Sequence, residues 1–74
     1  MTEQEIYKII GYNTKKYRKQ SNKKLTQKEL AKRIGVCTSL IGSLESNNIN
    51  QGISVYNLYK ISKVLNISID NFFK

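Results

Sequence analysis

Side chains that could carry out covalent chemistry are scarce in this sequence of 74 residues. It has no His, one Cys and five acidic residues. It offers no glycine-rich phosphate loop and no plausible pair of carboxylates for general acid and base work. A single Cys makes no internal disulfide, and without His the usual zinc-ligand spacings are missing. We therefore expect no enzyme activity, no bound metal and no cofactor.

The residue types instead favour binding to a polyanion. Thirteen Lys and Arg residues stand against five Asp and Glu residues, which gives a formal net charge of +8 and an isoelectric point of about 9.8. This excess indicates a nucleic acid first, and an anionic membrane surface second, as the partner, unless the basic run is only a solvated surface. Nine of the basic residues fall between residues 15 and 33: Lys15, Lys16, Arg18, Lys19, Lys23, Lys24, Lys28, Lys32 and Arg33.

A second stretch, GVCTSLIGSLES at residues 35–46, is rich in hydroxyl side chains and has no Lys or Arg.

No apolar run of the sequence approaches the ~20 residues needed to span a bilayer, and residues 1–15 lack an apolar core of signal-peptide length. We therefore expect a cytoplasmic protein made of one domain, residues 1–74, without membrane contact and without room for a small-molecule domain.

Helical spacing along the chain and the absence of Pro predict an all-α domain. Thr2 followed by Glu5, and Thr26 followed by Glu29, are capping boxes that begin the first two helices. Later helices are expected to begin after Ser54 and Ser68, and Asn66 is expected to end the fourth. The predicted helices span residues 3 to about 20, 27–34, about 38–46, 55–65, and a short segment that ends at Phe72 and Phe73.

The turn between the second and third predicted helices positions the hydroxyl-rich stretch. Gly35 is expected to take a left-handed conformation, in which a Cβ atom is unfavourable. Two short helices joined by such a turn form an arrangement that can insert its second helix into the major groove of DNA. Apolar side chains should fasten the two helices and leave the outer face of the third free; these are Leu30, Ala31, Ile34, Val36, Leu40, Ile41 and Leu44.

The segment LTQKELAKRIGVCTSLIGSLES, residues 25–46, resembles the helix-turn-helix of the Cro and cI repressors, also called the XRE family. The resemblance extends from Ile10-Gly11 and Tyr17-Arg18 to the ending LYKISKVLNISIDNFF. It implies a compact five-helix, lambda-repressor-like domain with its helix-turn-helix at about residues 26–46. It also implies sequence-specific binding to double-stranded DNA by a small transcriptional regulator, such as a repressor or controller protein, of a prokaryotic or phage nucleoid.

The resemblance assigns roles to individual residues. Thr38, Ser39 and Ser43 match positions that face base edges, with Cys37 beside them. Glu45 matches an acid that typically pairs with an Arg of the first helix, here Arg18. The resemblance also implies phosphate contacts for Gln27, Asn47, Asn48 and Asn50. Independently of the resemblance, the outward-facing cations of the second helix are expected to bind phosphates; these are Lys28, Lys32 and Arg33.

Three features depart from the family pattern. The segment between Arg18 and Leu25 is about two residues longer than usual, which puts the pairing of Arg18 with Glu45 in question. Cys37 stands where a Ser or Thr cap is usual, so this cap is weakened or replaced by Thr38. Gly42 lies mid-helix at a cost of roughly 1 kcal/mol relative to Ala, either to let the backbone approach DNA closely or because it is tolerated.

Several residues allow two interpretations. Cys37 at a helix start could be a redox sensor, but we expect a small, half-buried packing residue. The tyrosines Tyr7, Tyr12, Tyr17, Tyr56 and Tyr59 could stack on bases, but their helical spacing favours packing in the core or in a dimer.

The chain is expected to form a homodimer on a pseudo-palindromic site, and a regulatory protein partner is possible. One alternative is an antitoxin-like or regulator-binding module that docks its basic face on an acidic protein. Another is non-specific binding to RNA or a membrane surface. The dimer surface is expected to involve Ile67, Ile69, Phe72 and Phe73, with Tyr56 or Tyr59 contributing.

Overall fold

Hydroxyl side chains begin three of the helices in the computed structural model, which describes residues 2–21, 25–46 and 53–74. Thr2, Thr26 and Ser54 each accept the backbone N–H of the residue three positions later, at 3.1–3.2 Å. The Thr26–Glu29 pair forms the complete capping box, with Glu29 also accepting the Thr26 N–H. The helices are α1 (Glu3–Gln20), α2 (Gln27–Ile34), α3 (Thr38–Glu45), α4 (Val55–Leu65) and the 3₁₀ helix η1 (Ile69–Phe73).

The all-α prediction is therefore confirmed, and the helix bounds agree with the sequence to within about a residue. Two details differ. The fifth helix is a 3₁₀ helix, whose first turn is closed by the bond from the Asn71 N–H to the Ser68 carbonyl at 3.0 Å. Ser68 precedes this helix as expected, but its side chain makes no capping hydrogen bond.

Left-handed residues end two helices as the sequence predicts. Gly35 has φ 76° and ψ 35° after α2, and Asn66 has φ 56° and ψ 43° after α4. After α2, the Gly35 N–H donates to Lys32 and the Val36 N–H donates to Ala31, which is the Schellman arrangement. These bonds satisfy carbonyls at the end of α2 and turn the chain toward α3.

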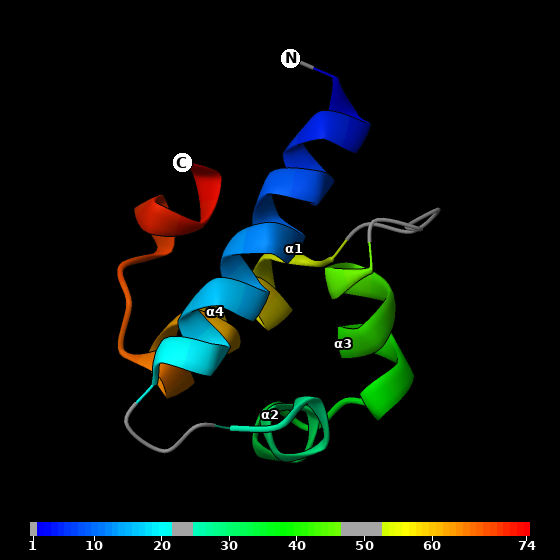
Figure 1. The fold of residues 1–74 in the computed structure, drawn as a ribbon, viewed down its shortest axis with the longest axis vertical. Coiled ribbons are helices and arrows are strands. Elements are labelled where there is room, and N and C mark those ends of the chain that lie inside the picture. Colours follow the sequence, from blue (N-terminus) through cyan, green and yellow to red (C-terminus); the bar gives the residue numbers. More distant parts are fainter. Residues whose placement is uncertain (1, 22–24, 47–52) are drawn as a thin grey trace.

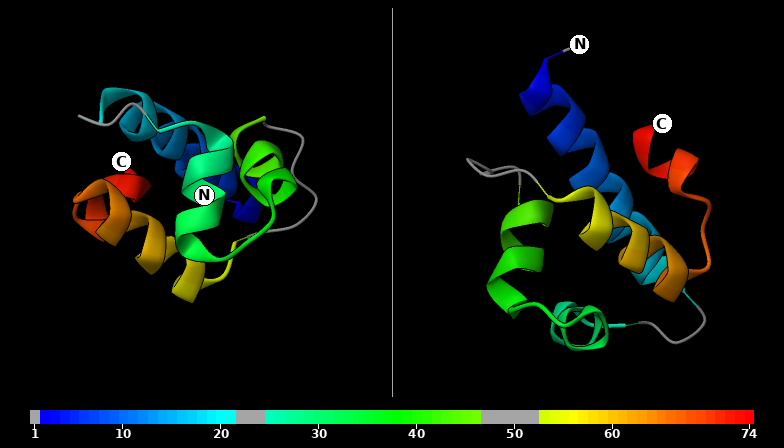
Figure 2. Two further views of the ribbon diagram at one scale, coloured as in Figure 1. Left: turned by 90° about the horizontal axis from the view of Figure 1, so that it is seen from below. Right: turned by 180° about the vertical axis from the view of Figure 1, so that it is seen from behind.

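The helices enclose one hydrophobic core. Figure 1 shows α1 crossing in front of α4, with α2 at the foot of the molecule, α3 on one side and η1 on the other, and the two views of Figure 2 agree. Leu30 of α2, Ile41 of α3, Ile61 of α4 and Phe72 of η1 are fully buried. Each helix thus contributes an apolar stripe to the same interior. None of the helices described is long and apolar enough to cross a membrane.

Phe72 and Phe73, which the sequence assigns together to the dimer surface, have different surroundings. Phe72 is fully buried, and its ring lies edge-on to Tyr17 with 5.5 Å between centroids. Its carbonyl accepts a 2.9 Å hydrogen bond from the buried Asn13 side chain. Phe73 is 49% exposed. The prediction that Phe72 lies on a dimer surface is therefore wrong, because α1 already covers its side chain.

Gly11 brings α1 and α3 into direct backbone contact. A Cβ atom built at this position would lie only 1.9 Å from the carbonyl oxygen of Leu44 and 3.0 Å from its carbonyl carbon. The close approach is open only to Gly, and it fixes the position of α3 against α1. The residues near Gly11 in the sequence do not predict this contact, because a Gly within a helical pattern only lowers the helix propensity slightly and does not indicate what it packs against.

Candidate nucleic-acid interface

The start of α2 presents unpaired backbone donors on the surface. The capping box uses the Glu29 N–H, and the Leu30 N–H donates to the Thr26 carbonyl at 3.0 Å. Among the described residues, the N–H groups of Gln27 and Lys28 have no such acceptor. Because the positive end of the helix dipole lies at the same place, this start suits an anion.

α3 has one buried and one free face. Ile41 and Leu44 are buried against the core, together with Ala31 and Ile34 of α2. On the opposite side Thr38, Ser39 and Ser43 are exposed. α2 and α3 lie at an angle to each other across the turn (Figure 2), so the apolar contacts hold α3 from behind and leave its hydroxyl side chains free.

Cys37 is the N-cap residue of α3, and its side chain makes no capping hydrogen bond. The thiol is exposed, which corrects the expectation of a half-buried packing residue; α3 begins at Thr38, and the cap residue before it faces solvent. Its Sγ lies 3.2 Å from the Ser39 hydroxyl oxygen. The hydrogen bond with Ser39, and then the nearby Leu40 backbone N–H, hold the pKa of the thiol below its ordinary value.

A buried ion pair connects α1 to α3, as the family resemblance implies. The Arg18 guanidinium donates to both Glu45 carboxylate oxygens, at 2.9 Å from Nε and 2.8 Å from Nη2. Its third donor, Nη1, bonds the Leu25 carbonyl at 2.9 Å. The longer segment before Leu25 therefore leaves the pair intact, because Arg18 itself anchors the far end of that segment.

Gln27 also belongs to this network, which the sequence does not reveal. Its Nε2 donates to Glu45 Oε1 at 3.0 Å, and its side-chain oxygen lies 3.5 Å from where a Cβ on Gly42 would stand. The first residue of α2 therefore lies beside the middle of α3. One N–H of the Gln27 amide is thus used by Glu45, and the phosphate contact of Gln27 stays a prediction.

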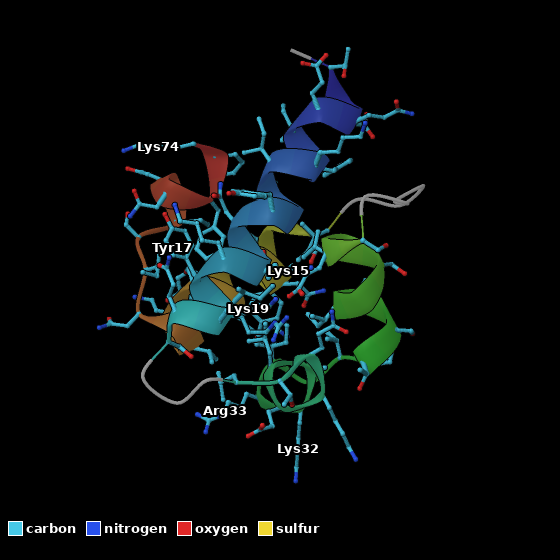
Figure 3. All side chains as sticks on the ribbon, viewed as in Figure 1. Lys15, Tyr17, Lys19, Lys32, Arg33 and Lys74 are labelled. Carbon is cyan, nitrogen blue, oxygen red and sulfur yellow. The ribbon has the colours of Figure 1, made fainter. Side chains whose placement is uncertain are left out.

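Exposed basic side chains lie on α2, the helix next to α3, and not on α3 itself. Lys28, Lys32 and Arg33 are all exposed on α2. Figure 3 shows Lys32 extending away from the body of the molecule below α2. The only charged residue of α3, Glu45, is buried and paired. The other predicted phosphate contacts, Asn47, Asn48 and Asn50, lie outside the described residues, as do Lys23 and Lys24.

Lys60 of α4 supports the other end of α2. Its Nζ donates to the Ile34 carbonyl at 2.6 Å, where the helix dipole is negative, and lies 4.5 Å from the centroid of the Tyr56 ring. The helix-turn-helix is thus tied to α1 through Arg18 and to α4 through Lys60. In the ranges described, no group of three or more His, Cys, Asp or Glu residues could hold a metal ion.

Comparison with known proteins extends these observations. A protein-family model described as helix-turn-helix matches residues 15–72. Among solved structures, the chain is similar to the crystal structure of a hypothetical transcription factor, NHTF, from Neisseria, with 25% sequence identity and a TM-score of 0.79. The match covers 97% of this chain and 76% of that chain. No curated protein matches significantly. The structural likeness therefore includes the whole core, from α1 to η1.

Proposed function

The chain belongs to the Cro/cI-type (XRE) helix-turn-helix family, and from this premise we propose that it binds double-stranded DNA sequence-specifically as a small transcriptional regulator, a repressor or controller protein. The observation that carries the proposal is the contrast between two adjacent surfaces. α3 offers exposed hydroxyl side chains without charge, and α2 beside it offers three exposed cations. A duplex has the matching contrast, since charged backbones border a major groove of ~12 Å width in which base edges are exposed.

Phosphate binding is the role proposed for α2. Its free N–H groups and the ammonium of Lys28 suit one phosphate at the helix start. Lys32 and Arg33 are exposed on the same helix, and their positive charges attract the neighbouring phosphates of the DNA backbone. Such contacts fix the register of the protein on the duplex but carry no information about base identity.

Base reading is the role proposed for α3. The hydroxyls of Thr38, Ser39 and Ser43 each make single hydrogen bonds to base edges, and the Thr38 methyl group suits contact with thymine. Without Lys or Arg, α3 has no bidentate grip on guanine. Specificity per base is therefore modest, and the shape and deformability of the operator supply much of the rest.

We further propose that the protein acts as a homodimer through the surface formed by α4 and η1. Tyr59 is 49% exposed and lines a hollow of about 320 Å³ together with the half-buried Ile67 and Ile69. Tyr56, 69% exposed, and Phe73, 49% exposed, are further large apolar side chains on these helices that are available to a partner. Phe72 has no part in this surface.

The position of this surface agrees with the spacing of DNA half-sites. η1 and α3 lie on opposite sides of the molecule in Figure 1, and the two shorter extents of the molecule are 23 and 20 Å. Two reading helices one helical turn apart are separated by ~34 Å, so each lies about 17 Å from the two-fold axis. Analytical ultracentrifugation should show a dimer, and Tyr59→Ala should weaken it. A monomer at micromolar concentration, with and without DNA, contradicts the dimer.

Selection from randomised duplex DNA tests the central proposal. We expect recovery of an inverted repeat with half-sites about 10 base pairs apart, bound roughly 10³-fold or more tightly than random DNA. Affinity should fall steeply as salt rises. If no consensus is recovered and binding to an acidic protein persists, the chain is an antitoxin-like or regulator-binding module and the proposal is wrong.

Cys37 provides a direct test of which helix enters the groove. It is the single Cys of the chain, and it is exposed at the start of α3. The selected duplex should protect it from alkylation by iodoacetamide, whereas an equal concentration of random duplex should protect it much less. Equal alkylation rates with and without the selected duplex would place α3 outside the groove.

A further inference from the structure

α1 carries a line of exposed cations that the roles proposed for α2 and α3 do not use. Lys8, Tyr12, Lys15 and Lys19 follow one another at intervals of four, three and four residues, and all four are exposed. This spacing places them on one side of a helix. We call these four residues the α1 stripe. At 1.5 Å per residue, it extends for about 16 Å from Lys8 to Lys19.

The neighbouring Lys16 is exposed beside the stripe. Its Nζ lies 5.5 Å from the centroid of the Tyr17 ring, and Lys16 also lines the hollow next to the stripe. The acid nearest the stripe on α1 is Glu5, whose carboxylate accepts from the Thr2 hydroxyl at 3.1 Å. The stripe is therefore cationic over most of its length.

The stripe borders the proposed DNA interface. Gly11, which touches Leu44 of α3, precedes Lys15 by one helical turn. A hollow of about 450 Å³ is lined by Glu45 of α3 and by residues of α1, namely Tyr12, Lys15 and Lys19 of the stripe together with Lys16 and Gln20. Figure 3 shows Lys15 on the side of α1 that faces α3, whereas Lys74 lies beside η1 on the other side of the molecule.

We propose that the α1 stripe is a second phosphate-binding surface, which binds the DNA backbone that flanks the segment read by α3. This inference rests on the DNA-binding function proposed above. The charge is complementary to phosphate, the Tyr12 hydroxyl is a further donor to phosphate oxygens, and the stripe is continuous with α3 through the hollow. The stripe lies on α1, beside α3 and not on it, so its lysines are available to the backbone next to the groove that α3 enters.

The proposal predicts a measurable contribution of the stripe to the salt dependence of DNA binding. Because Gly11 fixes the two helices together, the lysines meet phosphates at a set distance from the reading residues. Each neutralised phosphate steepens the dependence of log affinity on log salt by about 0.9. Between 1 M and 0.1 M salt, one such contact therefore raises affinity by about 8-fold, and two contacts raise it by about 60-fold.

The test compares a double variant of the stripe with a control variant, both in the full chain. Lys15→Ala with Lys19→Ala removes two lysines of the stripe, and Lys74→Ala removes an exposed lysine that lies beside η1 on the other side of the molecule. The single variant Lys15→Ala loses the same charge as this control and is compared with it directly. Affinity is measured as a function of salt on two duplexes. One is the selected sequence with extended flanks, and the other is trimmed to the bases that α3 reads.

On the long duplex at 0.1 M salt, the stripe variant should bind about 60-fold more weakly than the unmodified chain, after the two affinities are normalised to their values at 1 M. The magnitude of its salt slope should fall by about 2. On the trimmed duplex it should match the unmodified chain, and its preferred bases should not change. The salt slope of the control variant should stay unchanged on both duplexes.

Two outcomes overturn the proposal. One is equal salt slopes for the two variants on the long duplex. The other is loss of binding to anionic phospholipid vesicles by the stripe variant while its duplex binding stays normal, which would assign the stripe to a membrane surface. The DNA-binding function itself fails on a different result, namely the lack of any preferred sequence in the unmodified chain.

Discussion

Replacing Gly11 and Gly42 separately by Ala should change stability in opposite directions. Both glycines lie inside α-helices, so Ala gains roughly 1 kcal/mol of helix propensity at each. At Gly42 the new Cβ would meet only the Gln27 side-chain oxygen at 3.5 Å, an ordinary contact. At Gly11 it would lie 1.9 Å from a backbone oxygen, so α1 and α3 have to separate by about 1.5 Å before the contact is normal.

The two magnitudes follow from these distances. Overpacking typically costs 1–3 kcal/mol, and the Gly11 site should exceed the upper end because backbone rather than a flexible side chain has to move. We expect Gly11→Ala to lose about 2–3 kcal/mol net, out of roughly 4–11 kcal/mol for a chain of this length. We expect Gly42→Ala to gain about 1 kcal/mol.

Thermal unfolding followed by circular dichroism at 222 nm measures the difference. At about 4–8 °C per kcal/mol for a domain of this size, the melting temperature should fall by about 8–24 °C for Gly11→Ala and rise by about 4–8 °C for Gly42→Ala. A Gly11→Ala protein as stable as the unmodified chain would show that α1 and α3 do not touch as described. If Gly42→Ala is more stable yet binds DNA less well, the DNA backbone approaches α3 at Gly42.

Three further perturbations test other parts of the structure. Glu45→Gln leaves the buried Arg18 guanidinium without a counter-charge, so it should lower the free energy of unfolding measured in urea titrations by about 3 kcal/mol. The control Glu29→Gln, at an exposed residue, should lower it much less. Equal losses would show that the stability contributed by Glu45 does not come from the ion pair. Lys28→Ala should weaken binding to all duplexes alike and flatten the salt dependence, while Ser43→Ala should change the preferred bases in repeated selections, and identical behaviour of the two would refute the division between phosphate binding and base reading. Hydrogen bonding with Ser39 holds the pKa of the Cys37 thiol below its ordinary value. The alkylation rate of Cys37 should therefore reach half of its plateau at a lower pH than in an unfolded peptide, and Ser39→Ala should raise this midpoint pH. An unchanged midpoint pH in Ser39→Ala would show that Ser39 is not the cause.

The features that the sequence predicted well depend on near neighbours in the chain. The start of α2 follows from Thr26 and Glu29, which are three residues apart and bond each other. The end of α2 follows from Gly35, because the left-handed conformation it adopts is unfavourable for residues with a Cβ. The pairing of Arg18 with Glu45 joins residues far apart, and it was available only through the family resemblance.

The features that could not be predicted from the sequence depend on how the helices pack against one another. Nothing near Gly11 in the chain indicates that Leu44 lies against it. Phe72 and Phe73 are adjacent and chemically identical, yet the short 3₁₀ helix directs one into the core and leaves the other half exposed. The Gln27 amide faces Glu45 only because α2 starts beside the middle of α3. Such contacts require the crossing geometry of the helices, which side-chain periodicity does not contain.

The inward position of Glu45 has a consequence for how the protein would search for its operator. Since α3 exposes no charge, it adds nothing to the attraction that holds the protein on random DNA, and that attraction comes from lysines on neighbouring helices. The affinity for random DNA, along which the protein slides, then depends on salt concentration. The preference for the operator comes from hydroxyl groups whose hydrogen bonds are insensitive to salt. Raising the ionic strength should therefore shorten each visit to DNA without changing the order in which competing sites are preferred.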